Sequence, residues 1–212
     1  MTMKPIIAID GPAAAGKGTL ARRIASTLGL PYLDTGLLYR AVGRRVLDAG
    51  GDPADAASAD AAARSLRPED LDRSDLRGPQ ADAAAASVAS IPGVRAALLD
   101  FQRDFAVQDG AVLDGRDIGT VIFPNAQAKL FVTAGLSERA RRRWLELRGK
   151  GLEADILTVE EDMRQRDAKD AARAAAPLKA ADDAYQLDTS TMDAEAAFQV
   201  ALAFIRTRIG MI

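Results

Sequence analysis

The sequence predicts a three-layer α/β fold built around a five-stranded parallel sheet. Three observations indicate this fold: short apolar runs recur along the chain, helical patterns lie between them, and an Asp-Gly pair ends two of the runs. Strands that alternate with helices form parallel sheets with helices on both faces. With 212 residues, of which 48% are hydrophobic, the chain can bury one substantial core.

The chain begins with a predicted strand, a glycine loop and a helix. Residues 6–9 form an apolar run that ends at Asp10 and Gly11, as expected for a strand that is buried on both faces. After Gly16 the period changes, because leucine and isoleucine recur at every fourth position from residue 20 to residue 28. This spacing predicts an amphipathic helix.

Four further runs predict the other strands of the sheet. They cover residues 32–33, 111–113, 130–132 and, with a weaker pattern, 185–187. Two helical faces lie among them: Val94, Ala97, Leu98, Phe101 and Phe105 form the first, and Phe198, Ala201, Leu202, Ile205 and Ile209 form the second.

Two regions fall outside this rhythm. Residues 48–80 are rich in Ala, Asp and Arg and hold few large apolar side chains, and residues 149–179 are strongly charged. We expect both to be solvent-facing excursions from the core. Gly149-Lys150-Gly151 follows no strand, so it is expected to be a simple turn.

The composition excludes several kinds of chemistry. With no cysteine there are no disulfides or thiolate metal sites, and with no histidine there is no imidazole base and no histidine-ligated metal. The net charge of −2 argues against a general nucleic-acid binder. No apolar stretch approaches the roughly 20 residues needed to cross a bilayer, and residues 1–9 do not read as a secretory signal. We therefore expect a soluble cytoplasmic protein without nucleic-acid or membrane partners.

The loop after the first strand predicts a phosphate-binding site. Its residues are Gly11, Pro12, Ala13, Ala14, Ala15, Gly16, Lys17, Gly18 and Thr19. Small residues let backbone N–H groups turn toward a phosphate, the helix that follows adds the positive end of its dipole, and Lys17 supplies a charge for the β and γ oxygens of a nucleotide. The alternative, a plain glycine turn with an exposed lysine, is disfavoured by the strand before the loop and the helix after it.

The position after Lys17 is Gly18, and the first hydroxyl comes at Thr19. Thr19 is therefore the candidate for holding Mg²⁺, directly or through water. The Asn-Lys-x-Asp motif by which GTPase switches read their base is missing from the sequence, which disfavours a signalling switch.

Two more segments predict a second anion site. Residues 34–40 combine Thr35, Tyr39 and Arg40 around a glycine turn, although Thr-Gly turns are also common without a ligand. Residues 114–120 follow a strand and contain Arg116 and Asp117. Ligands of open parallel sheets collect at such strand ends, but a purely structural ion pair would explain the same residues.

A charge run over residues 164–173 places Arg166, Asp170 and Arg173 on one face of a helix. A solvated helix with ordinary ion pairs is the alternative. That plain interpretation suits Arg139, Arg141, Arg142 and Arg143 better, so for them the sequence predicts only a weak hinge or ATP-side role.

Taken together, these segments resemble bacterial cytidylate kinases. The Gly-Lys-Gly-Thr ending of the loop is like that of nucleoside monophosphate kinases related to adenylate kinase, while Asp114 to Thr120 is specific to the cytidylate kinase pattern. The remaining matching segments, spread over nearly the whole chain, are Ile91 to Arg95, Phe123-Pro124, Arg166-Asp167, Asp170, Arg173, Ala176 to Leu178 and Leu187 to Ser190.

The resemblance implies a P-loop NTPase fold with a core at 1–34, 108–145 and 180–212, a region for binding the nucleoside monophosphate (NMP) at 35–107, and a lid at about 146–179. It also implies phosphate binding by Arg40, Arg116 and Arg173, reading of cytosine by Arg95 and Asp117, and contacts of Arg166 and Asp170 with the ribose or phosphate region. Lys17, Arg116, Arg166 and Arg173 are the expected catalytic residues, and Thr35 and Tyr39 join the CMP site. In chemical terms, Asp117 would accept from the cytosine amino group and Arg95 would donate to O2 and N3.

The implied reaction moves the γ-phosphoryl group of Mg-ATP onto CMP or dCMP. Another small P-loop kinase acting on AMP, UMP or a metabolite stays open, as does an ATP-binding regulatory module. The chain departs from the family at two places: residues 66–80 are too short and polar for the antiparallel sheet that many relatives insert, and Ala86, next to Ser87, stands where the family has serine. We expect a monomer, because no exposed apolar stripe is obvious.

Overall fold

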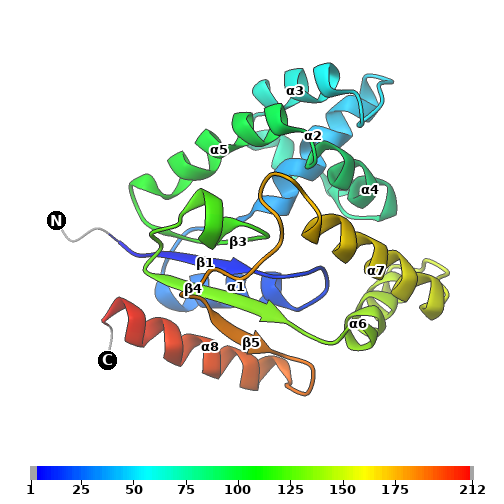
Figure 1. Cartoon of the computed structure of the whole chain (residues 1–212). Coiled ribbons are helices and arrows are strands. Elements are labelled where there is room, and N and C mark those ends of the chain that lie inside the picture. The colour runs from blue at the N-terminus through cyan, green and yellow to red at the C-terminus, as the bar shows by residue number, and fades with distance from the viewer. Residues whose placement is uncertain (1–3, 211–212) are drawn as a thin grey trace. The chain divides into compact units, whose positions relative to one another are not determined.

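The structure is a computed structural model that describes residues 4–210. Its centre is a five-stranded sheet in the order β2-β3-β1-β4-β5 (Figure 1). The strands are β1 (Ile6–Asp10), β2 (Tyr32–Asp34), β3 (Ala111–Gly115), β4 (Ala128–Thr133) and β5 (Tyr185–Asp188). β1 pairs in parallel with β3 and β4, and β4 pairs in parallel with β5. The predicted α/β fold with a five-stranded parallel sheet is therefore confirmed.

The chain forms two compact units. Unit 1 contains the residues up to Leu33 and those from Asp109 onward, and unit 2 is Asp34–Gln108. Unit 1 holds α1 (Lys17–Leu28), the single π-helical turn η3 (Ile118–Ile122), α6 (Leu136–Gly149), α7 (Ile156–Ala171) and α8 (Ala194–Ile209).

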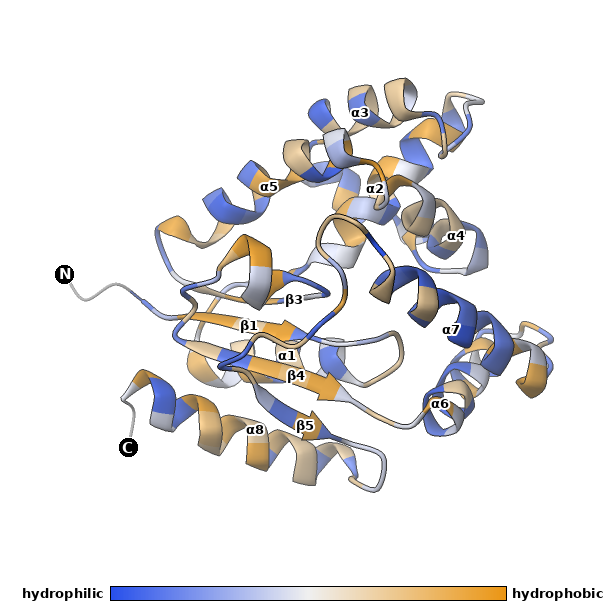
Figure 2. Ribbon diagram, in the orientation of Figure 1, coloured by the Kyte–Doolittle hydropathy of each residue, from blue (hydrophilic) through white to orange (hydrophobic). Residues whose placement is uncertain are grey.

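The main core of unit 1 lies between the sheet and the helices α1 and α8. It contains apolar residues of the strands, among them Ile7, Val112 and Leu130, together with Ile24 of α1 and Ile205 of α8. Figure 2 shows the matching hydrophobic colour along β1, β4 and α8. Fully burying one such side chain stabilises the fold by about 1.5–3 kcal/mol, so this cluster dominates the stability of unit 1.

α6 and α7 form a helical pair with a small core of its own. Ala140 and Leu147 of α6 pack against Val159 and Met163 of α7. Asp155 caps α7 by accepting from the backbone N–H of Thr158 at 2.8 Å. The charged stretch 149–179 is thus only partly the solvent-facing excursion that the sequence predicts, because one face of α7 is buried. Figure 2 shows why the apolar pattern of α7 is weak in the sequence: most of the helix is hydrophilic.

Unit 2 is built from helices. They are α2 (Thr35–Asp48), α3 (Ala56–Arg64), the 3₁₀ turns η1 (Pro68–Asp72) and η2 (Ser74–Leu76), α4 (Pro79–Val88) and α5 (Pro92–Val107). α2 and α4 approach closely at Gly43, where a Cβ would lie 2.7 Å from the Cβ of Ala84. No strand forms between Leu66 and Gln80, a stretch that the structure describes throughout.

The solvent-facing prediction for residues 48–80 is partly wrong. Helix α3 is capped by Asp55, whose carboxylate accepts from the N–H of Ser58, and it buries Ala59 and Ala63. Leu76 is also buried, at 1% exposure. The alanines hide this core from sequence analysis, because they fit a buried or an exposed helix face equally well.

Among residues 4–210 no single helix is long and apolar enough to cross a membrane. α4 and α5 satisfy the length and composition criteria only as a pair, and they are bent by 101° at the break between them.

Candidate active site

The glycine loop joins β1 to α1, and its backbone turns tightly. A Cβ on Gly11 would lie 2.0 Å from the carbonyl oxygen of Val132 on β4, so only glycine fits there. Ala14 and Gly16 adopt left-handed backbone angles, with φ of 56° and 88°. Successive N–H groups in such a loop point inward and create a concavity that attracts anions.

Two further features make this loop suitable for phosphate. α1 begins at Lys17, and its first turn carries no acidic residue that would compete with an anion for the positive end of the helix. The Nζ atom of Lys17 lies 3.4 Å from the carbonyl oxygen of Pro12, so the ammonium group folds back over the loop. Backbone N–H groups, a helix N-terminus and one cation therefore converge.

Arg139 of α6 stabilises the glycine loop through polar contacts. Its Nε donates to the Ala134 carbonyl at 2.8 Å, and its Nη1 donates to the Ala13 carbonyl of the loop at 3.4 Å. Both Nη atoms bind the carboxylate of Asp167 on α7, at 3.2 and 2.6 Å. Arg139 is 6% exposed, so the plain surface role that suits a charge run does not describe it. It links the glycine loop to α7.

Thr189 supplies a second brace. Its hydroxyl lies 3.2 Å from the Ala15 carbonyl of the loop and 3.1 Å from the Thr133 carbonyl at the end of β4. Arg142 donates to this hydroxyl at 3.0 Å and to the Thr189 carbonyl at 2.7 Å. The place of Thr189 just after the last predicted strand could indicate a functional role from the sequence. Arg139 and Arg142 stand in a run of arginines, and nothing in that run distinguishes them from solvent-exposed neighbours.

Unit 1 also brings three of the predicted acceptor-site residues together. Asp170, which is 2% exposed, accepts a hydrogen bond from Nε of Arg116 at 3.0 Å and another from Nη2 of Arg173. Arg173 lies just beyond the end of α7, so the predicted single helix face does not include it. Arg166 lies on α7 itself. One carboxylate thus gathers two guanidinium groups, and this cluster keeps a net positive charge that suits an anion.

Three carboxylates lie at the carboxyl ends of β1 and β3. Asp10, Asp114 and Asp117 are all at most 5% exposed. Burial raises the pKa of Asp10 to about 7, although hydrogen bonds from the backbone N–H groups of Gly119 and Ile118 oppose that rise. The charge of Asp117 raises the pKa of Asp10 further, and the charge of Lys17 lowers it.

The donors near Thr19 fit a magnesium ion that enters with a nucleotide. The hydroxyl of Tyr32 donates to Oδ1 of Asp114 at 2.8 Å, and Oδ2 of Asp114 lies 3.5 Å from where a Cβ on Gly18 would stand. Within residues 4–210 no group of three or more acidic side chains could hold a metal by itself. Mg²⁺ prefers one or two protein oxygens with water and phosphate oxygens, so the Asp114 carboxylate beside Gly18 suits it. Asp114 was not predicted as a ligand from the sequence.

In unit 2, Arg40 lies between two carboxylates. Its Nε donates to Asp82 at 3.1 Å, and its Nη1 is 3.8 Å from Asp34. That Nη1 atom is buried and makes no hydrogen bond with any group that the structure describes. A Cβ on Gly36 would lie 3.1 Å from the same nitrogen, so the glycine leaves it room. A buried N–H without a hydrogen-bond acceptor is a suitable place for an anion oxygen.

The other predicted residues of unit 2 lie on three helices. The guanidinium of Arg95, on α5, lies 5.7 Å from the centre of the Tyr39 ring on α2, and its Nη1 donates to the Ala89 carbonyl at 3.4 Å. Thr35 is buried at the first position of α2. Ala86, which stands where a serine was expected, is half-buried on α4.

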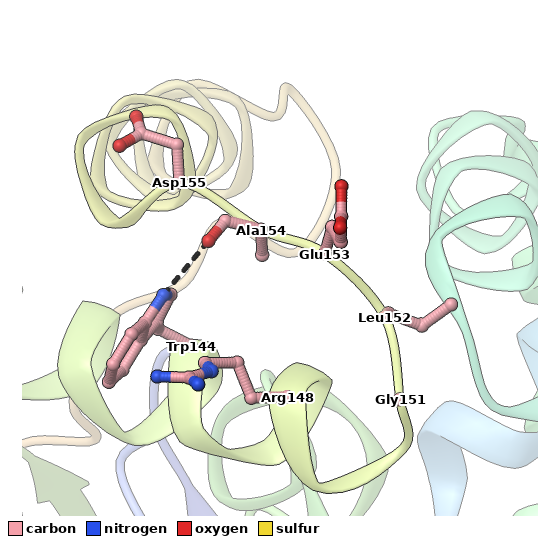
Figure 3. A pocket seen from close by; sticks show the side chains of 7 residues that line it. All are labelled: Trp144, Arg148, Gly151, Leu152, Glu153, Ala154 and Asp155. Carbon is pink, nitrogen blue, oxygen red and sulfur yellow. Dashed lines mark hydrogen bonds between the residues drawn. The ribbon is translucent and has the colours of Figure 1, made fainter.

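An open pocket lies beside the loop that joins α6 to α7 (Figure 3). Nε1 of Trp144 donates to the Ala154 carbonyl at 2.9 Å, and the guanidinium of Arg148 stands 4.8 Å from the centre of the Trp144 ring. These contacts fix the turn after Gly149. None of the residues that line the pocket belongs to the predicted phosphate or acceptor sites, so we assign it no role in the reaction.

The fold is shared with solved structures of low sequence identity. A gluconokinase from Sinorhizobium meliloti 1021 superposes with a TM-score of 0.53 at 14% identity, covering 100% of this chain and 97% of the other. The parallel sheet and the glycine loop between β1 and α1 define the class of this protein as a P-loop fold. The family model for cytidylate kinase matches residues 7–207. The chain belongs to the cytidylate kinase family.

Curated relatives agree over nearly the whole chain. A cytidylate kinase from Granulibacter bethesdensis is 61% identical, covering 97% of this chain and 99% of the relative. One from Acidiphilium cryptum is 62% identical, with 95% of each chain covered. One from Paramagnetospirillum magneticum is 62% identical, covering 97% of this chain and 100% of the relative. The family and the cytidylate kinase activity predicted from the sequence are confirmed.

Proposed function

We propose that this enzyme transfers the γ-phosphoryl group of Mg-ATP to CMP or dCMP, giving ADP with CDP or dCDP, in pyrimidine nucleotide metabolism. The observation that carries the proposal is the chain of contacts through Arg139. This arginine binds Ala13 of the glycine loop and Asp167 of α7, one turn before Asp170. A phosphate loop is thereby joined to the helix that holds Arg116 and Arg173, as a transfer between two phosphates requires.

On the donor side, the loop from Gly11 to Thr19 would bind the ATP phosphates. Backbone N–H groups would hold the nonbridging oxygens, and Lys17 would swing from Pro12 to the β and γ oxygens. Thr19 and Asp114 would hold Mg²⁺, which when bound neutralises charge on the β- and γ-phosphate oxygens. Family membership supports this use of Mg-ATP.

On the acceptor side, Arg40, Arg116 and Arg173 would bind the phosphate of CMP. Arg116 and Arg173 are supported by their shared carboxylate partner Asp170, and Arg40 by its buried Nη1. Thr35 and Tyr39, which belong to the same helix as Arg40, would complete this side of the site. Arg166 and Asp170 would engage the ribose or phosphate region.

We propose that Asp117 and Arg95 distinguish cytosine from uracil. A carboxylate accepts from the amino group of cytosine but repels the carbonyl oxygen that uracil presents at the same position. A guanidinium donates to O2 and to N3, which is an acceptor in cytosine and a donor in uracil. Asp117 is 5% exposed, so an unmatched partner would leave a buried charge unpaired.

The reaction needs no side-chain base. The attacking atom is a phosphate oxygen of the acceptor, which is already ionised at neutral pH because the second pKa of a phosphate monoester is near ~6. Positioning and charge neutralisation by Lys17, Arg116, Arg166 and Arg173 then carry the catalysis. A chain without histidine is fully equipped for this chemistry.

Comparing acceptors tests the proposal. ADP formation from Mg-ATP is measured with CMP, dCMP, UMP or AMP at equal concentrations. We expect CMP and dCMP to give rates far above UMP and AMP. Equal rates with all four would overturn the cytidine assignment and favour another acceptor. A slow ATPase that ignores every monophosphate would favour an ATP-binding regulatory module instead.

We further propose that the enzyme works as a monomer in the cytoplasm. Membership of a nucleotide kinase family supports the location, and the family's reaction uses small soluble substrates. Size-exclusion chromatography with light scattering at micromolar concentration tests the first part, because a dimer would double the 22.4 kDa mass of the chain.

A further inference from the structure

Asp10 is a buried carboxylate whose position no step of the proposed reaction explains. It ends β1 and stands in register with Gly115 on β3 and Phe131 on β4. Its side chain is 5% exposed, and both of its oxygens are engaged. Oδ1 accepts from the backbone N–H of Ile118 and Oδ2 from that of Gly119, each at 2.8 Å. With both oxygens held in this way, Asp10 is poorly placed to act as a base.

The two N–H groups belong to the turn that follows Arg116 and Asp117. Ile118–Ile122 forms a single π-helical turn, in which the N–H groups of Ile122 and Phe123 bond back to the carbonyls of Asp117 and Ile118. The first N–H groups of any helical turn have no partner within it. An external carboxylate from β1 satisfies them here.

This arrangement changes what Asp117 can do. Asp117 occupies the N-cap position of the turn, where an Asp side chain usually accepts from the backbone N–H groups two or three residues ahead. Its side chain makes no such capping bond. Asp10 performs that task in its place, because it accepts from the first two N–H groups of the turn.

The close approach of the turn depends on Gly119. A Cβ at this position would lie 3.4 Å from Oδ2 of Asp10 and 3.1 Å from Cδ of Lys129. The ammonium group of Lys129, which is 6% exposed, donates to the Pro124 carbonyl just after the turn and to Asp183 at 2.8 Å. Asp10 at its start and Lys129 at its end thus fix the turn to β1 and β4.

We propose that Asp10 is a positioning residue for nucleotide recognition: it replaces Asp117 as the cap of the turn and so fixes Asp117 and Arg116 for binding the acceptor. This inference rests on the proposed function, because it assumes that Asp117 and Arg116 contact CMP. It predicts that damage at Asp10 appears in acceptor binding and not in ATP binding.

The test is Asp10→Asn, which keeps the shape of the side chain but turns an –NH₂ group toward a backbone N–H. We expect the Kd of CMP, measured by calorimetry without ATP, and the KM of CMP to rise about tenfold, as for the loss of one charge-assisted hydrogen bond. The KM of ATP should change less than about twofold. Asp109→Asn makes the same chemical change at an exposed site whose partner is Lys4, and it should leave all three constants unchanged.

A second variant protects the test against misfolding. Gly119→Ala adds one methyl group against Oδ2 of Asp10 without forcing a left-handed backbone, so it should move CMP binding in the same direction by a smaller factor. Unchanged CMP affinity in a folded Asp10→Asn enzyme, or an equal rise in the KM of ATP, would overturn the inference. If the wild-type protein does not use CMP, the proposed function is overturned as well. If the wild type does use CMP but the Asp10→Asn enzyme gives either of the two results above, only the role of Asp10 is overturned.

Discussion

Buried carboxylates of unit 1 perform separate tasks because their partners differ. Asp10 accepts only from backbone N–H groups and therefore orders a turn. Asp170 accepts only from arginine side chains and therefore gathers cations. Asp114 accepts from the hydroxyl of Tyr32 and lies beside Gly18 at the start of α1. The same chemical group thus serves geometry at Asp10 and charge at Asp170, and we propose that it serves metal binding at Asp114.

Replacing the proposed base-reading pair should separate acceptor recognition from ATP binding. Asp117→Ala combined with Arg95→Leu removes a hydrogen-bond acceptor and a donor for cytosine, each worth about 1–3 kcal/mol by analogy with base readout in DNA. We expect the KM of CMP to rise by at least about tenfold and the preference for CMP over UMP to collapse, with the KM of ATP nearly unchanged. If turnover of CMP survives the double change, these residues do not read the base.

The raised pKa of Asp10 predicts a specific dependence of stability on pH. Its pKa is about 7 in the fold, chiefly because it is buried, against 3.8 as the ordinary value. The folded protein therefore keeps a proton that the unfolded chain releases, and the stability gained from the protonated form is lost as the pH rises from about 4 to about 7. An asparagine does not titrate, so Asp10→Asn should lose that dependence.

Urea unfolding of the wild type and Asp10→Asn at acidic and mildly alkaline pH measures this effect. The destabilisation caused by the substitution should shrink as the pH rises from about 4 to about 7, because the wild type then carries a buried charge near Asp117 that Lys17 and two N–H groups offset in part. A difference between the two proteins that stays constant across this range would show that the carboxylate is already ionised well below pH 7.

At the residue scale, the positions of the motif residues could be predicted from the sequence, but the residues that hold the site in place could not. Lys17, Arg116 and Asp117 follow predicted strands in recognisable spacing, and the structure places them in the segments after β1 and β3, with Lys17 at the first position of α1. Asp10 and Arg139 owe their roles to burial and to partners over a hundred residues away, or on another helix. Local sequence carries no record of such partners.

At the scale of elements, α6 connects the parts of unit 1 that we propose to bind phosphate. Arg139 and Arg142 project from it to the glycine loop at Ala13, to Thr189 after β5, and to α7 at Asp167. A movement of α7 relative to α6 would therefore also displace the glycine loop. We propose that α7 belongs to a lid that closes over both nucleotides and prevents transfer to water, and these contacts would couple its movement to the glycine loop.

The Arg139–Asp167 ion pair should be energetically coupled. Its side chains are 7% and 27% exposed, and two hydrogen bonds join them. In a double-mutant cycle with Arg139→Met and Asp167→Asn we expect a coupling free energy of about 1–3 kcal/mol in the free energy of unfolding. The exposed Lys4–Asp109 pair, changed to Met and Asn, is the control and should show no measurable coupling. Additive effects at Arg139 and Asp167 would mean that this ion pair does not help to hold α7 against α6.

Elements of strong period were predicted well, and elements rich in alanine or charge were not. The strands and the helices α1 and α8 match their predicted patterns because large apolar residues mark the buried face. The predicted face of α5 is only partly right, because burial continues from Val94 and Leu98 through Gln102 and Ala106, while Phe101 and Phe105 are half-buried. α3 and α7 bury mostly alanines or a few isolated side chains such as Val159 and Met163, so the sequence makes them look solvent-exposed. Arg173 was assigned to a helix face because nothing local reveals that α7 ends at Ala171.

For the molecule as a whole, the strand order sets where chemistry can occur. β1 lies between β3 and β4, so the loop after β1 and the Asp114–Thr120 segment after β3 emerge side by side at the carboxyl edge of the sheet. The alternation of strands and helices predicts a parallel sheet, but the order of its strands comes from long-range packing and could not be predicted from the pattern. The mechanism needs neither cysteine nor histidine, which agrees with a composition that lacks both.

The most direct test follows the phosphoryl group itself. The enzyme is incubated with Mg²⁺ and ATP labelled in the γ position, with CMP as the acceptor and UMP in a parallel reaction, and the products are separated by chromatography. We expect the label to appear in the β position of CDP, with little transfer to UMP. Label found only as inorganic phosphate, or transferred equally to both nucleotides, would contradict a kinase that recognises cytidine monophosphate.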